Sequence, residues 1–220
     1  MSKAKTKRIF SDLFNTDYSI LKVKYNVRAD EAPADVQIKN TLGKKAGTNS
    51  ITELARICTS PKLKDFVDFY SKHDGFDLAT PKSPRNVVKK TLLRQIPASD
   101  LEKFTSHYLP GGRWAWTIDL NKTKALYRNE NKWLAFAEVN GGPACLTIFL
   151  DGENAGNVFL LNAQPHFNIL KPIARTYAGL LDRIAKDPAA FFKLIKAYVV
   201  LPGENGQNYG HVPLEYVDKN

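Results

Sequence analysis

The chain has 220 residues, of which 43% are hydrophobic and 11% aromatic, enough for one domain with extensions or for two small domains. It contains no run of about 18 apolar residues, which excludes a transmembrane helix, and its basic first residues lack the apolar stretch of a signal peptide. The net charge of +10 raises the question of an acidic partner, either nucleic acid, a protein or a membrane surface. We expect a cytoplasmic protein.

The two cysteines, Cys58 and Cys145, are too few for a disulfide framework or for a metal site of their own. Cys58 follows a helical pattern and Cys145 lies in an apolar stretch, so both are expected to be reduced residues of the core. The four histidines are spread widely along the chain, which argues against a metal site.

Residues 1–50 are expected to form an N-terminal extension that adds a strand or packs loosely. Within it, residues 20–27 alternate in the manner of a strand, with Leu21 and Val23 on the same side. Residues 42–49 are rich in Gly, Lys and Asn, a composition typical of a flexible linker.

Two helices are predicted after this linker. Ser50 and Glu53 have the spacing of a capping box, which predicts a helix beginning near Ser50. Ser60 followed by Pro61 predicts the start of a second helix, because proline is tolerated at the first helical position. Gly75 is expected to supply a left-handed residue after this helix.

The segment 82–94 carries five basic side chains and no acidic one. These are Lys82, Arg85, Lys89, Lys90 and Arg94. They predict either an anion-binding patch or, in the interpretation we favour, the solvated face of a segment whose apolar residues face the core.

The next segments are predicted as a helix and a strand. Ser99 and Glu102 again have capping-box spacing, which predicts a short helix. Residues 113–120 alternate, with Trp114 and Trp116 on one face, and predict an edge strand or a half-exposed strand. Paired indoles are more typical of packing than of a platform for stacking bases.

Residues 132–161 give the clearest pattern in the chain and predict a meander of three antiparallel strands. The first strand ends at Asn140 and Gly141, a pair that favours the tight turn of a hairpin. The second strand is expected over residues 144–150 and the third over residues 157–161, with a turn rich in Asp, Gly and Asn between them.

The C-terminal part predicts further helices. Residues 166–172 are expected to add one short strand, and residues 175–185 have the periodicity of an amphipathic helix. Asp187 before Pro188 predicts a capped second helix. Residues 202–220 are rich in Gly, Asn and Pro and are expected to form a loose arm.

No catalytic motif occurs in the chain: there is no phosphate-binding loop, dinucleotide fingerprint, zinc-protease helix or nucleophile elbow. Asp151 and Glu153 lie in a turn that lacks the alternating oxygen ligands of a calcium loop. We therefore expect no enzymatic activity, no catalytic or metal-binding residues and no cofactor.

Four segments follow one another along the chain: FYSKHDGFDL, WLAFAEVNGGPACLTIFLD, GNVFLL and TYAGLLDRIAKDPAAFF. Their order and spacing resemble the SUKH superfamily, which includes Smi/Knr-type regulators of fungal cell-wall synthesis and many bacterial immunity proteins. The resemblance covers about residues 51–196. It implies an α+β fold, with a twisted and mainly antiparallel sheet flanked by helices, in a domain of residues 51–201. The chain departs from many members in being basic, and residues 1–50 have no counterpart.

The resemblance implies a non-enzymatic domain that binds another protein. In bacteria such domains typically neutralise a cognate toxin, often a nuclease. Because this chain is basic, we expect the toxin or other partner to present an acidic contact surface. The expected contact residues are Trp114, Trp116, Asp151 and Glu153.

Two other functions stay open. One is a nucleic-acid-associated basic protein that uses the segment 82–94 and the basic N-terminus, and the other is a regulatory scaffold of the SUKH type. The first predicts an affinity that falls steeply with salt. A membrane partner is not expected.

Overall fold

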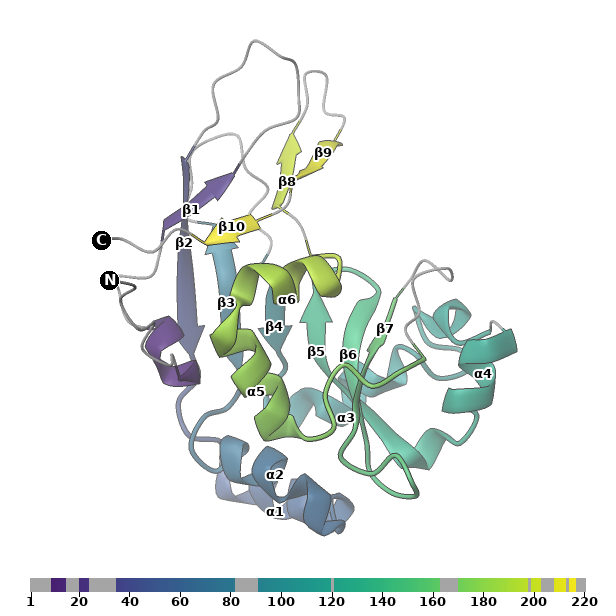
Figure 1. Ribbon diagram of the computed structural model, residues 1–220. Helices are drawn as coiled ribbons and strands as arrows, with labels where there is room; N and C mark the ends of the chain where they lie inside the picture. Colours follow the sequence, from purple (N-terminus) through teal and green to yellow (C-terminus); the bar gives the residue numbers. More distant parts are fainter. Residues whose placement is uncertain are drawn as a thin grey trace, which may run out of the picture.

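The computed structural model (Figure 1) describes the chain in nine ranges: 9–14, 20–23, 35–81, 91–119, 121–162, 170–197, 199–202, 208–212 and 214–216. The fold is α+β, with an antiparallel sheet flanked by helices, as the sequence predicts. In Figure 1, α5 and α6 lie in front of the sheet and α3 lies behind it.

The sheet has eight strands in the order β10-β1-β2-β3-β4-β5-β6-β7, and every neighbouring pair is antiparallel. Its strands are β1 (Ile20–Val23), β2 (Asp35–Leu42), β3 (Phe76–Pro81), β4 (Leu93–Gln95), β5 (Trp133–Val139), β6 (Ala144–Phe149), β7 (Val158–Leu161) and β10 (Leu214–Tyr216). A separate pair is formed by β8 (Val199–Pro202) and β9 (Asn208–Val212).

The predicted meander of residues 132–161 is confirmed as β5, β6 and β7. Asn140 and Gly141 have φ angles of 58° and 61°, and the Gly142 N–H donates to the carbonyl of Val139 at 3.1 Å. Two consecutive left-handed residues of this kind define the turn that matches the twist of a hairpin. The Asn-Gly pair therefore forms the turn that its chemistry favours.

The helices are α1 (Thr48–Ile57), α2 (Lys64–Tyr70), α3 (Leu101–Ser106), α4 (Asn121–Tyr127), α5 (Tyr177–Lys186) and α6 (Pro188–Leu194). Short 3-10 helices are η1 (Phe10–Phe14), η3 (Pro61–Leu63), η4 (Ala98–Asp100), η5 (Ala115–Thr117) and η6 (Glu130–Lys132). The cap predicted at Asp187 is confirmed, because its carboxylate accepts the Ala190 N–H at 2.9 Å.

Both predicted capping boxes are wrong. Ser50 lies inside α1, which begins at Thr48, and Glu53 forms an ion pair with Arg56 instead. Ser99 lies within η4, where neither it nor Glu102 makes the expected cap. Both predicted helices are present, α1 from Thr48 and α3 from Leu101, but neither begins with the predicted cap.

The strand predicted over residues 113–120 is also wrong, because the chain there forms a turn followed by η5. Gly112 packs against the end of α3, where an added Cβ would lie 2.6 Å from the His107 carbonyl carbon. The Thr117 hydroxyl then donates to the Trp114 carbonyl at 2.9 Å and closes the 3-10 turn. Close approach to α3 thus bends a segment whose alternation is typical of a strand.

Residues outside the expected domain limits contribute to the sheet and its core. Residues 35–42, within the expected N-terminal extension, form β2, and Ile38 is fully buried. The Asn40 side chain donates to the Leu13 carbonyl at 2.6 Å and accepts the Ala79 N–H at 2.8 Å, so it fastens η1 to the sheet. Residues 214–216, expected in a loose arm, pair as β10 with β1.

Two of the predicted strands lie partly outside the described ranges. Residues 24–27 of the first predicted strand lie outside them, as do residues 163–169, which include most of the strand expected at 166–172. The linker expected at 42–49 is shorter in the structure, since β2 ends at Leu42 and α1 begins at Thr48. No helix in the described ranges is both long and apolar enough to cross a membrane.

The core lies on both faces of the sheet, with α3 packed on β5 behind it and an aromatic cluster in front. Phe66 of α2, Phe136 of β5 and Tyr177 of α5 meet edge to face, with ring centroids 5.1–5.9 Å apart. All three side chains are fully buried. These aromatic contacts fix α2 and α5 on one face of the sheet and leave the far face of β2, β3 and β4 for other contacts.

Candidate functional site

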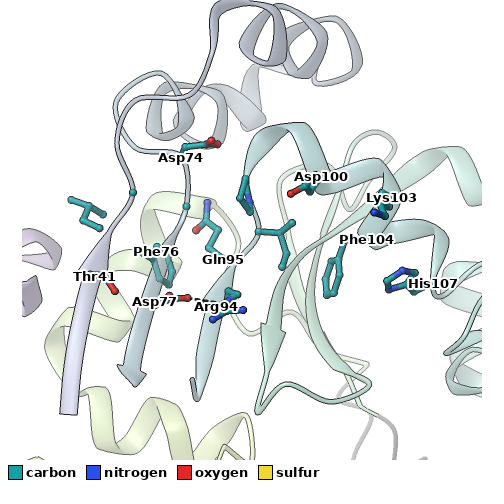
Figure 2. A pocket seen from close by; sticks show the side chains of 15 residues that line it. Thr41, Asp74, Phe76, Asp77, Arg94, Gln95, Asp100, Lys103, Phe104 and His107 are labelled. Atoms are coloured by element: carbon teal, nitrogen blue, oxygen red, sulfur yellow. Dashed lines mark hydrogen bonds and ion pairs between the residues drawn. The ribbon is translucent and has the colours of Figure 1, made fainter. Parts of the chain in front are cut away.

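An open groove of about 570 Å³ lies between the far face of β2–β4 and the helix α3 (Figure 2). Its lining includes six charged or titratable side chains of both signs. They are Asp74, Asp77, Arg94, Asp100, Lys103 and His107. Apolar side chains such as Phe104 lie between them, so the groove combines an apolar wall with a polar surface.

The floor of the groove is set by the alternation of β3 and β4. Asp77 and Arg94 are register partners, and the Arg94 Nε donates to the Asp77 carboxylate at 2.9 Å. Their neighbours Phe76 and Gln95 point into the core, where Gln95 accepts the Tyr177 hydroxyl at 2.6 Å. Because successive side chains of a strand point to opposite faces, burial of Phe76 and Gln95 sends Asp77 and Arg94 into the groove.

The ion pair is half exposed, with 50% of the Arg94 side chain and 31% of the Asp77 side chain accessible. Exposed pairs of this kind contribute little to stability. Glu138 on β5 lies opposite Arg94 in register, so a row of opposite charges runs across three strands. The floor is thus polar and solvated without being strongly charged.

The wall of the groove comes from the segment that follows β4. The Asp74 carboxylate accepts the Ala98 N–H at 2.7 Å and so fixes the start of η4. The helix α3 then carries Lys103, Phe104 and His107 along the groove, with the Phe104 ring nearest the strands (Figure 2). The Thr105 hydroxyl on the other side of α3 accepts the Ala135 N–H at 3.0 Å, which fastens α3 to β5.

The loop after α3 (residues 109–119) is joined to the end of that helix, because the Trp114 N–H donates to the His107 carbonyl. In this loop the Arg113 guanidinium lies 4.6 Å from the centre of the Trp114 ring. Trp116 exposes 49% of its surface, which is unusual for so large an apolar residue. The loop is therefore joined by its backbone to His107, which lines the groove.

The four predicted contact residues lie on two different loops. Trp114 and Trp116 belong to the loop after α3, whereas Asp151 and Glu153 lie between β6 and β7. Asp151 forms an exposed ion pair with Lys132 at 3.5 Å, and Glu153 is exposed. Their role in binding stays a prediction.

Of the predicted anion patch, Arg94 is the member that the structure describes, and it lines the groove. Lys82, Arg85, Lys89 and Lys90 lie outside the described ranges. The sequence did not single out the other charged residues of the groove. For Asp77, a signal was available, since it is a charged residue between the apolar Phe76 and Leu78 of a predicted extended segment.

The strongly perturbed titratable groups lie in the core. Burial raises the pKa of the Cys58 thiol to about 12, and it raises the pKa of Cys145 and of Tyr127 above their ordinary values. Both cysteines are free and buried, as predicted. A thiol whose pKa is raised by burial is a poor nucleophile, so these positions suit packing and not catalysis.

Within the described ranges, no group of three or more His, Cys, Asp and Glu side chains is arranged to hold a metal ion. The groove itself is open to contact with a second molecule. Its paired charges and apolar wall can form hydrogen bonds, ion pairs and packing contacts with a second molecule.

No protein-family model matches the chain, and no curated protein matches its sequence.

Proposed function

We propose that the chain is a non-enzymatic protein-binding domain of the SUKH type and that it neutralises a cognate bacterial toxin by covering part of its surface. The proposal is supported by the meander β5–β7 and the closing helices α5 and α6, which occupy the order that the resemblance implies. A fold alone does not define a function, so the proposal also depends on the residues of the candidate site.

The observation that carries the proposal is the open groove, together with the exposed Trp116 on the loop that follows α3. Small-molecule sites usually enclose most of their ligand, whereas this groove is wide and exposes half of the Arg94 side chain. Protein interfaces combine an aromatic or apolar centre with a polar rim of both charges. Phe104 supplies an apolar contact within the groove, Trp116 supplies one on the loop after α3, and the charged residues around the groove supply polar contacts of both signs.

The direct test is capture of a partner by the full chain from lysate of its source cells, at low and moderate salt and after nuclease treatment. We expect one protein to be retained at moderate salt after the nuclease step. Co-expression of that protein with and without this chain then measures whether the chain restores growth. A captured protein that is harmless when expressed alone would contradict the toxin-neutralising function.

Binding to nucleic acid is the second candidate. It is supported by the net charge of +10, but the described member of the basic segment, Arg94, is already paired with Asp77. Retention that disappears with salt or nuclease would favour nucleic acid over the protein partner, because phosphate contacts weaken steeply with salt.

A further inference from the structure

The loop after α3, defined as residues 109–119, has the features of a preformed anchor for a partner protein. Trp116 is the exposed aromatic residue of this loop, at 49% accessibility. Tryptophan is among the residues most enriched at the energetic centres of protein interfaces. An exposed indole can serve as an anchor only if contacts within its loop hold it in one position.

The loop is held in one conformation by its own contacts. The Gly112 N–H donates to the Leu109 carbonyl at 2.8 Å, and Gly112 packs against His107 too closely for a side chain. Thr117, next to Trp116, is fully buried, and both its N–H and its hydroxyl donate to the Trp114 carbonyl, at 3.0 and 2.9 Å. The indole is thus presented by a rigid turn, and little conformational entropy is lost when it binds.

The charges on this part of the chain are mainly positive. Between residues 113 and 130 the exposed basic side chains are Arg113, Lys122, Lys124 and Arg128, and the exposed acidic side chains are Asp119 and Glu130. Stacking on Trp114 orients the Arg113 guanidinium and leaves its N–H groups for a carboxylate. An acidic surface complements this arrangement and would be attracted to it at long range.

We infer that Trp116 is the anchor of an interface with an acidic protein surface, which receives the indole in an apolar pocket ringed by carboxylates. The inference rests on the proposed function and adds to it the contact residue and the chemistry of the partner. A protein is favoured over single-stranded nucleic acid because Trp114 is half-buried under Arg113, so the loop offers one open indole and not a row of stacking platforms.

The test places a photo-cross-linking benzoylphenylalanine in place of Trp116 in the full chain, and in place of Leu170 as the control. Leu170 is also an exposed apolar residue, at 41% accessibility, but lies in the segment before α5. We expect the probe at position 116 to cross-link one protein, through a peptide rich in Asp and Glu. The inference fails if both positions give the same products or if position 116 gives no product. It also fails if position 116 cross-links a basic peptide or a nucleic acid.

The second arm measures affinity for the captured protein. Loss of a central aromatic anchor weakens binding by about 30-fold or more, so we expect that loss for Trp116→Ala, a smaller loss for Trp116→Phe and none for Leu170→Ala. If Trp116→Ala binds as tightly as Leu170→Ala, the inference fails while the proposed function stands. If the full chain captures no protein at all, the proposed function fails with it.

Discussion

The loop between β6 and β7 allows packing and backbone strain to be separated by experiment, because it contains two left-handed glycines in different surroundings. Gly152 has φ of 68° and no described atom within 4 Å of an added Cβ. Gly156 has φ of 79°, and its added Cβ would lie 2.8 Å from the Lys62 carbonyl oxygen and 2.9 Å from the Lys62 Cβ. Replacement by alanine strains both positions but creates a clash at only one.

We expect Gly152→Ala to lower the free energy of unfolding by about 1 kcal/mol, the cost of a left-handed alanine. Gly156→Ala adds overpacking against the backbone of η3, which brings its cost to roughly 2–4 kcal/mol. For a chain of this size the larger cost corresponds to a fall of roughly 5–15 °C in Tm.

The assay is urea denaturation of the wild type and both variants, followed by circular dichroism and tryptophan fluorescence, with the denaturant slope compared to confirm that the same transition is observed. The difference between the two variants measures the packing of the β6–β7 loop on η3. Equal costs for the two variants would refute the packing of Gly156 against Lys62.

Three further predictions concern the core and a helix cap. Tyr127→Phe should lower the free energy of unfolding by about 1–2 kcal/mol, because the fully buried Thr147 hydroxyl loses its 2.6 Å hydrogen bond. The double variant with Thr147→Val should lose less than the sum of the two single variants. Burial raises the pKa of Cys58 from 9.0 to about 12, so its contribution to stability is complete below pH 9 and is lost as the pH rises toward 12. Denaturation between pH 8 and 10.5 should therefore show a shallower alkaline loss in Cys58→Ala than in the wild type, and parallel curves would contradict the shift. Asp187→Ala should lower the unfolding free energy by about 1 kcal/mol through loss of the α6 cap, whereas Asp187→Asn should keep most of it. Equal losses for both variants in urea denaturation would show that the cap is not the cause.

The parts of the fold that the sequence predicted correctly depend on neighbouring residues. The Asn140-Gly141 turn and the Asp187 cap are both determined within four residues, and both were identified. The three strands of the meander alternate with turns that have clear chemistry, so their order followed directly. In these segments local preference and tertiary packing agree.

The errors occur where contacts between elements, and not the local residue pattern, decide the structure. The N–H of Ala98 is capped by Asp74, which lies 24 positions away, and the capping box predicted at Ser99 could not reveal this. The segment 113–120 alternates as a strand does, but contact of Gly112 with α3 bends it into a turn. Tertiary contacts of this kind leave no local pattern in one sequence.

The candidate site was predicted only in part for the same reason. Arg94 was singled out by residue type, but its place in the groove depends on the register of β3 against β4 and on the position of α3. Asp74 and Lys103 join the groove from two segments that are separated by β3 and β4 in the sequence. Only the folded chain brings them together.

The pairing of β1 with β10 has a consequence for the order of assembly. Leu21 lies opposite Tyr216, about 195 positions later in the chain, so this edge of the sheet has no partner until nearly the whole polypeptide has been synthesised. The strands β2–β7, which pair with near neighbours, can assemble earlier on the ribosome. During that interval the outer edge of β1 presents unpaired backbone groups, and this edge is where a nascent chain would depend on protection from aggregation.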